Sequence, residues 1–129
     1  MSSEVKFENQ GAGVVVTYTG VVTGEDIRAM NAYIYASDHL PRIRYQLFDF
    51  TKADRLEVTN EDVRFFAMQD KAASEQNPHM IGAIIGDMSL YQGYERIFRV
   101  YSQIWSGIPT EFFTTIEEGR AWVASKLKE

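Results

Sequence analysis

Alternation of apolar and polar residues divides the chain into segments typical of strands and segments typical of helices. The strand segments are rich in β-branched and aromatic residues, which fit a pleated sheet. The first two are joined by Asn9–Gly13, a short stretch with Gly and Asn, so we expect an antiparallel hairpin there. The five expected strands are Val5–Glu8, Val14–Thr19, Ile43–Phe50, His79–Ile85 and Thr110–Thr114.

Four further segments repeat their apolar residues at steps of three and four, which predicts helices. Each begins with a Ser or Thr that is followed three residues later by Asp, Glu or Gln. This is the capping box, in which the two side chains satisfy free N–H groups of the first helical turn. The expected helices begin at Thr23, Thr59, Ser89 and Thr115, and the first three end near Ser37, Asn77 and Ser106.

The helix expected over Ser89–Ser106 carries many aromatic rings on one side. Rings at helical spacing usually belong to a core, so we expect this helix to lie over the sheet with its rings turned inward. A buried tyrosine needs a partner for its hydroxyl group. Tyr91, Tyr94 and Tyr101 are therefore candidates to line a pocket between this helix and the sheet.

The helix expected from Thr59 has two apolar sides. One side would pack on the sheet. The other side contains Phe65, Met68 and Ala72, and it would need a second partner, either a neighbouring helix or another protein. An exposed apolar face of this kind also favours a homodimer. These three residues are therefore candidate interface residues.

Together the elements follow the order ββαβαβαβα in one domain spanning residues 1–129. Strands that alternate with helices after a hairpin predict an α/β fold. We expect a single mixed five-stranded sheet with four helices. The N-terminal hairpin would be antiparallel, and the rest of the sheet would be mostly parallel with right-handed crossovers.

Charge and composition argue against several classes of function. The formal net charge of −5 disfavours nucleic acid and anionic membrane surfaces as partners. The absence of cysteine removes disulfides, thiolate metal sites and thiol nucleophiles, and it fits a cytoplasmic protein. The sequence has no segment with the pattern of a membrane span or a secretory signal.

Acidic residues near the expected strand ends are candidates for a polar site. In an open α/β sheet, ligands bind beyond the carboxyl ends of the parallel strands, where Asp49, Asp54 and Asp87 are expected. Asp49 and Asp87 would there bind a cation or act in acid–base chemistry. The alternative is that these carboxylates cap local turns.

The two histidines, His39 and His79, lack any local ligand pattern. The sequence also has no glycine-rich run of the kind that cradles phosphates. We therefore expect no metal, no cofactor and no catalytic residue.

The strand ending in Leu47–Thr51 and the Thr-capped helix at Thr59, in this order of elements, resemble the STAS domain, the fold of anti-sigma-factor antagonists. Those antagonists are phosphorylated on a serine in the turn that opens a helix. The resemblance places Thr59 at this position, and Thr51 ends the Asp-Phe-Thr triplet before it. Thr59 and Thr51 are thus implied as candidate phospho-acceptor or regulatory residues.

The C-terminal part of the chain resembles STAS-like bacterial proteins that are related in topology to CRAL-TRIO lipid-binding domains. The pattern that carries this resemblance contains Glu111, Ile116 and Trp122. With the lack of a convergent catalytic set, the resemblance implies a non-enzymatic regulatory or protein-interaction module that binds another protein or a second copy of itself. Two alternatives remain open: binding of a small, lipid-like apolar ligand in a pocket under the aromatic helix, and an enzyme that uses Asp49 or Asp87.

Overall fold

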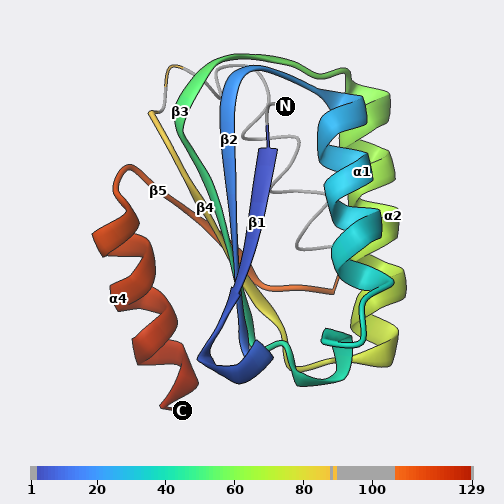
Figure 1. Ribbon diagram of the computed structural model, residues 1–129, viewed down its shortest axis with the longest axis vertical. Helices are drawn as coiled ribbons and strands as arrows, with labels where there is room; N and C mark the ends of the chain where they lie inside the picture. Colours follow the sequence, from blue (N-terminus) through green and yellow to red (C-terminus); the bar gives the residue numbers. More distant parts are fainter. Residues whose placement is uncertain (1–2, 88, 90–106, 129) are drawn as a thin grey trace.

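The computed structural model describes residues 3–87, 89 and 107–128 of the chain. These residues form one five-stranded sheet in the order β1-β2-β3-β4-β5, with helices on both faces (Figure 1). Strands β1 and β2 pair antiparallel, and every other neighbouring pair is parallel. The predicted mixed α/β sheet is therefore confirmed. The strands are β1 (Ser3–Glu8), β2 (Gly13–Thr23), β3 (Tyr45–Glu57), β4 (Ile81–Ile85) and β5 (Thr110–Phe113).

The described residues contain three α-helices: α1 (Gly24–Tyr35), α2 (Asn60–Gln76) and α4 (Ile116–Leu127). Helices α1 and α2 cover one face of the sheet side by side, and α4 covers the other face (Figure 1). The helix expected over residues 89–106, with Tyr91, Tyr94 and Tyr101, lies outside the described residues. Two short 3₁₀ turns, Asn9–Gly11 and Leu40–Arg42, connect elements at the opposite end of the sheet from the starts of α1 and α2.

Every described α-helix begins with the capping box that the sequence predicts. The backbone N–H of the third helical residue donates to the hydroxyl of Thr23, Thr59 or Thr115, at distances of 3.0 to 3.2 Å. The acidic side chain of that third residue accepts a hydrogen bond from the backbone N–H of the threonine in return. Local sequence therefore sets where each of these helices starts.

Two strands are longer than predicted. Strand β2 continues to Thr23 and β3 continues to Glu57, and the two remain paired in parallel to their ends. The extension passes through register shifts near Gly20, which adopts a φ of +69°. The β3 extension is mostly polar and exposed, so it lacks the apolar alternation of a strand, and its backbone pairing with β2 is what keeps it extended.

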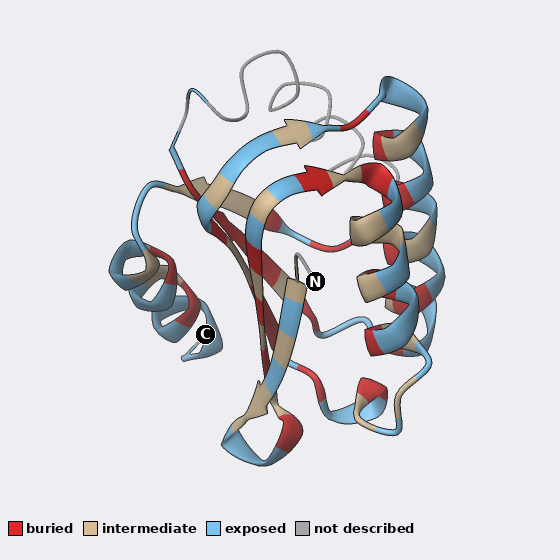
Figure 2. Ribbon diagram, turned by 45° about the horizontal axis from the view of Figure 1, so that its top comes forward, coloured by how far each residue is buried: buried red, intermediate tan, exposed pale blue. Residues whose placement is uncertain are grey.

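The core has two layers because the middle of the sheet is covered on both faces (Figure 2). Strand β3 shows the consequence most clearly. Leu47 faces α4, whereas Gln46 is 1% exposed and is buried on the side of α1 and α2. The α4 layer consists of Tyr45, Leu47, Ala83, Ile85 and Val123. The α1–α2 layer includes Val14, Val16, Tyr18, Val22, Ile34, Ile43 and Phe50.

A polar cluster joins α4 to the first hairpin. Arg120 of α4 donates two hydrogen bonds, of 2.9 and 3.1 Å, to the carboxylate of Glu8 at the end of β1. The hydroxyl of Tyr45 donates to the same carboxylate. Hydrogen bonding from Arg120 lowers the pKa of the Glu8 carboxyl. The cluster thus ties together elements that lie at opposite ends of the chain.

Candidate functional site

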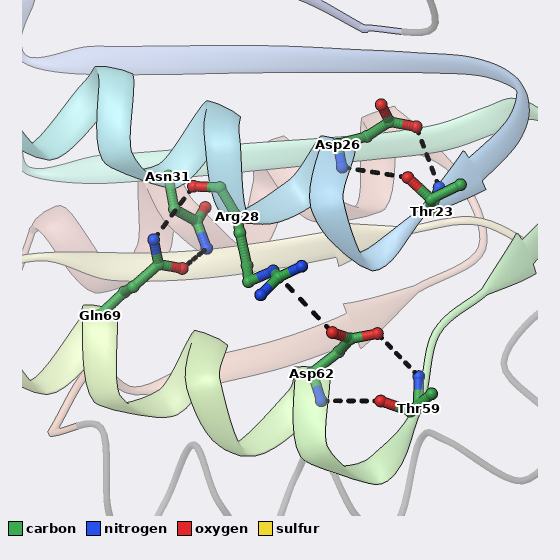
Figure 3. Close-up of polar contacts among 7 residues, drawn as sticks. All are labelled: Thr23, Asp26, Arg28, Asn31, Thr59, Asp62 and Gln69. Carbon is green, nitrogen blue, oxygen red and sulfur yellow. Dashed lines mark hydrogen bonds and ion pairs between the residues drawn. The ribbon is translucent and has the colours of Figure 1, made fainter.

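The N-termini of α1 and α2 lie side by side at one end of the sheet (Figure 3). Asp62, in the first turn of α2, closes the capping box with Thr59 and also lies 3.9 Å from Nε of Arg28 on α1. Gly24 permits this approach, because a Cβ atom there would lie 2.1 Å from Oδ2 of Asp62. Arg28 therefore reaches across to the start of α2.

Arg28 also contacts the outer surface of α2. Its guanidinium carbon lies 5.4 Å from the centre of the Phe65 ring, within the range of a cation–π contact. Phe65 is 44% exposed and Met68 is 61% exposed, and Ala72 is exposed on the same helix. The three candidate interface residues therefore face solvent within the described part of the chain. Their role as an interface stays a prediction.

Thr59 is exposed at the start of α2. Its hydroxyl accepts the Asp62 backbone N–H at 3.0 Å, and its own N–H donates to the Asp62 carboxylate at 3.0 Å. Thr51 lies within β3, where its hydroxyl donates to Asp49 at 2.7 Å. Thr59 thus stands at the N-terminus of a helix, a position that favours an anion, with two acidic residues, Glu61 and Asp62, in the first turn.

The candidate polar site at the strand ends differs from the expectation. Asp49 and Asp54 lie inside β3, because that strand continues to Glu57 and does not end near Phe50. The Asp49 carboxylate accepts the Thr51 backbone N–H at 2.9 Å. Asp87 does follow β4, and it accepts the Ser89 backbone N–H at 2.8 Å, a hydrogen bond that lowers its pKa. The carboxylates of Asp49 and Asp87 each accept the backbone N–H of the residue two positions later, which is the kind of local contact that the alternative interpretation expects. A polar site at Asp49 and Asp87 stays a prediction.

A cavity of about 70 Å³ lies between the sheet and helices α1 and α2. A volume of this size holds roughly five water molecules or an organic molecule of about six non-hydrogen atoms. Its described walls are mostly apolar, and they come from both helices and from strands β2 to β5. The apolar walls include Ile27, Phe48, Phe50, Leu56, Val63, Phe66, Ile84 and Phe112.

Six polar side chains line this cavity: Tyr18, Asn31, Tyr35, Gln46, Asp70 and Thr110. The Tyr35 hydroxyl donates to Oδ1 of Asp70 at 2.6 Å, and the Gln46 amide nitrogen donates to the Tyr35 oxygen at 3.2 Å. Two further polar atoms, the Tyr18 hydroxyl and Oε1 of Gln46, are buried without a hydrogen-bond partner among the described residues. A buried polar atom in this state costs about 1–3 kcal/mol, so the cavity retains unused hydrogen-bonding capacity.

Burial dominates the ionisation of this cluster. It raises the pKa of the Asp70 carboxyl to about 7, although the hydrogen bond from Tyr35 partly opposes this shift. Burial also raises the pKa values of Tyr18 and Tyr35, and the charge of Asp70 acts in the same direction on both. Both hydroxyl groups are therefore neutral near pH 7, and Asp70 is the group that titrates there.

Sequence reasoning did not select Tyr18, Tyr35, Gln46 or Asp70 as site residues. The sequence nevertheless contains a pattern that indicates one of these residues, Asp70. Asp70 lies on the buried side of α2 at helical steps from Val63, Phe66, Ala67 and Ala73, and an acidic residue within an apolar helix stripe indicates a buried charge. The other three become recognisable only when the sheet and α1 are placed together.

The described residues contain no group of three or more His, Cys, Asp or Glu side chains that would suit a metal ion. Within the same residues, none of the helices combines the length and hydropathy needed to span a membrane.

Comparison with known proteins identifies a structural neighbour. The chain matches no protein-family model and no curated protein. It is similar to the structure of the Bacillus cell fate determinant SpoIIAA in its phosphorylated form, with a TM-score of 0.56 and 11% sequence identity. The match covers 94% of this chain and 98% of the other. At this identity the similarity shows a shared fold, so the STAS-like fold expected from the sequence is confirmed.

Proposed function

We propose that the chain is a regulatory module of STAS-like fold that acts by binding a protein partner through the surface near the start of α2. The observation that carries this proposal is the pair of exposed apolar side chains, Phe65 and Met68, beside the capped N-terminus of that helix. Exposed apolar side chains that cluster within a polar rim are typical of protein-binding surfaces. The structural neighbour is described in its phosphorylated form, which supports a regulatory role for a chain of this fold.

The same surface suggests how it is regulated. A phosphate on Thr59 would add nearly two negative charges next to Asp62, with which Thr59 now exchanges both capping hydrogen bonds. Repulsion would push the Asp62 carboxylate away, and Arg28 would then pair with the phosphate. Because Arg28 also lies over the Phe65 ring, modification of Thr59 would change the proposed binding surface directly.

The partner is either a second copy of the chain or another protein, and sedimentation velocity tests the first case. We expect reversible dimers, and we expect Met68→Lys to weaken dimerisation by about tenfold or more, since it places a charge in a desolvated surface. Gln76→Lys is the matched control, because it makes the same charge change at an exposed position at the end of α2. Equal association of both variants would contradict self-association through this surface.

A photo-crosslinking residue tests the second case in living cells. Placed at Met68, it should give a discrete crosslinked protein, and placed at Gln76 it should give none. A chain that stays monomeric and yields the same crosslinks from both positions would refute the proposed interaction surface.

The cavity favours a second function, the binding of a small and mostly apolar ligand. The specific observation is that a largely apolar wall carries a few buried polar atoms, two of them without partners in the described part of the chain. Titration with fluorobenzene, followed by ¹⁹F NMR, tests whether the cavity takes up such a molecule. Gly82 lines the cavity at a position where an added Cβ meets Thr110 Oγ1 at 3.3 Å. We therefore expect Gly82→Val to reduce the binding by filling space, and unchanged binding would place the ligand elsewhere.

A further inference from the structure

The hydrogen bonds around Asp70 form a chain in which Gln46 donates to Tyr35 and Tyr35 donates to Asp70. An ionised carboxylate only accepts hydrogen bonds, so the proton between Tyr35 and Asp70 belongs to Tyr35. The Tyr35 oxygen is then free to accept, and the Gln46 amide must turn its nitrogen toward it. The same nitrogen also points to the sulfur of Met80 at 3.9 Å. Both donor hydrogens of Gln46 are thus engaged, and its oxygen is left facing away from this chain of hydrogen bonds.

Thr110, which also lines the cavity, likewise has no free hydrogen to donate. The Thr110 hydroxyl donates its proton to the backbone oxygen of Ile108 at 2.9 Å. The Thr110 hydroxyl oxygen can therefore only accept a hydrogen bond from a neighbour. Its Oγ1 atom lies close to Gly82, another lining residue. Two of the polar side chains in the cavity, Gln46 and Thr110, thus present acceptors and have no hydrogen left to donate.

The charge of the lining acts against anions. Among the described lining residues, Asp70 is the one carboxylic acid, and no lysine, arginine or histidine is present. Tyr18 is neutral and can donate or accept, so it does not discriminate between head groups. A carboxylate ligand would meet a buried negative charge without a cation to offset it, which is strongly unfavourable.

We propose that the cavity between the sheet and helices α1 and α2 selects small apolar molecules that carry a hydrogen-bond donor, such as a compact alcohol of about six non-hydrogen atoms, and rejects carboxylates. The Gln46 oxygen receives the donor hydrogen of the ligand. This inference rests on the second function proposed above and specifies its ligand class. A ligand without a donor leaves the buried oxygen unpaired, and a preference of about tenfold follows from one neutral hydrogen bond.

Three probes of six non-hydrogen atoms each test the proposal by ¹⁹F NMR titration at about pH 8, where Asp70 is ionised given its raised pKa. They are 2,2,2-trifluoroethanol, 1,1,1-trifluoropropane and difluoroacetate. We expect saturable binding of trifluoroethanol, binding of trifluoropropane that is weaker by about tenfold, and no saturable binding of difluoroacetate. Equal affinity for trifluoroethanol and trifluoropropane, or preference for difluoroacetate, would overturn the head-group assignment while leaving the cavity as a binding site. Failure of all three probes and of fluorobenzene would remove the second function itself.

The variant Gln46→Met tests whether Gln46 selects the head group, since methionine keeps about the length of the side chain and removes the acceptor oxygen together with the amide donor to Tyr35. We expect the variant to bind trifluoroethanol as weakly as trifluoropropane, with no change in affinity for trifluoropropane. Gln76→Met is the matched control at an exposed position and should keep the wild-type preference. A uniform loss of affinity for both probes in Gln46→Met would indicate a structural role and would refute the assignment of Gln46. The wild-type preference between the probes remains decisive if that variant does not fold.

Discussion

Replacement of Asp70 by asparagine should make the protein more stable than wild type at alkaline pH and leave it about as stable at acidic pH. Asp70 is buried, with 9% of its surface exposed, and its hydrogen-bond partner is the neutral Tyr35 hydroxyl. Asparagine has nearly the same shape and retains an oxygen that accepts from Tyr35. It cannot ionise, so the variant removes the cost of a buried charge and little else.

The magnitude follows from the raised pKa of the carboxyl. Its value moves from 3.8 to about 7, and each pKa unit corresponds to about 1.4 kcal/mol. The folded state therefore binds a proton more tightly than the unfolded state, and the wild-type free energy of unfolding falls as pH rises between these two values. The full loss is about 4 kcal/mol above pH ~8, and we expect Asp70→Asn to recover about 2–4 kcal/mol there.

Urea denaturation followed by far-UV circular dichroism measures this effect at a series of pH values from ~5 to ~9. The difference between variant and wild type isolates Asp70, because the other titrating groups are common to both proteins. Asp38→Asn, at an exposed position, is the control and should shift stability by less than about 0.5 kcal/mol at every pH. A difference between Asp70→Asn and wild type that does not grow with pH would refute the reasoning, as would a variant that is less stable at alkaline pH.

Three further substitutions test other parts of the structure by the same denaturation assay. Tyr18→Phe should stabilise the protein by about 1 kcal/mol, because it removes a buried hydroxyl that lacks a partner among the described residues; a loss of stability would mean that this hydroxyl is satisfied. Gly24→Ala should destabilise by about 1–3 kcal/mol, since its methyl group would meet the Asp62 carboxylate at 2.1 Å; a neutral effect would show that the two helix starts are further apart. Arg120→Met should cost about 0.5–1 kcal/mol near pH 7, because the pair with Glu8 is partly exposed. The pKa of Glu8 is lowered below 4.5 in the folded state, so this cost should disappear as pH falls below 4.5 and through that lowered pKa, and a constant cost would indicate lost packing alone.

Local signals in the sequence predicted most of the architecture. Each described helix starts at the predicted threonine, because a capping box is a contact between residues three apart and needs no tertiary context. The hairpin and the order of strands and helices along the chain followed from periodicity and connection lengths. The extension of β3 was missed, since a polar segment is kept in the sheet by pairing with β2, which its own side chains do not indicate.

The candidate site was harder to predict, because it depends on contacts between distant segments. The exposure of Phe65 and Met68 agrees with a helix that has two apolar sides. Asp49, by contrast, lies inside β3, where its carboxylate accepts the backbone N–H of Thr51. The cavity cluster joins Tyr35 of α1, Gln46 of β3 and Asp70 of α2. A contact among three elements that are distant in sequence leaves no short sequence motif by which to predict it.

The position of α4 affects how the chain reaches its folded state. The α4 layer of the core includes Tyr45, Leu47 and Ile85, and Val123 of α4 packs against them. During synthesis β3 and β4, which carry Tyr45, Leu47 and Ile85, leave the ribosome before α4 does, so this apolar surface is exposed to water until α4 docks. The bond between Arg120 and Glu8 spans 112 positions in sequence, and such long-range closure slows folding. Premature termination before Ile116 would leave the patch bare, and we expect those truncated chains to aggregate or to be degraded.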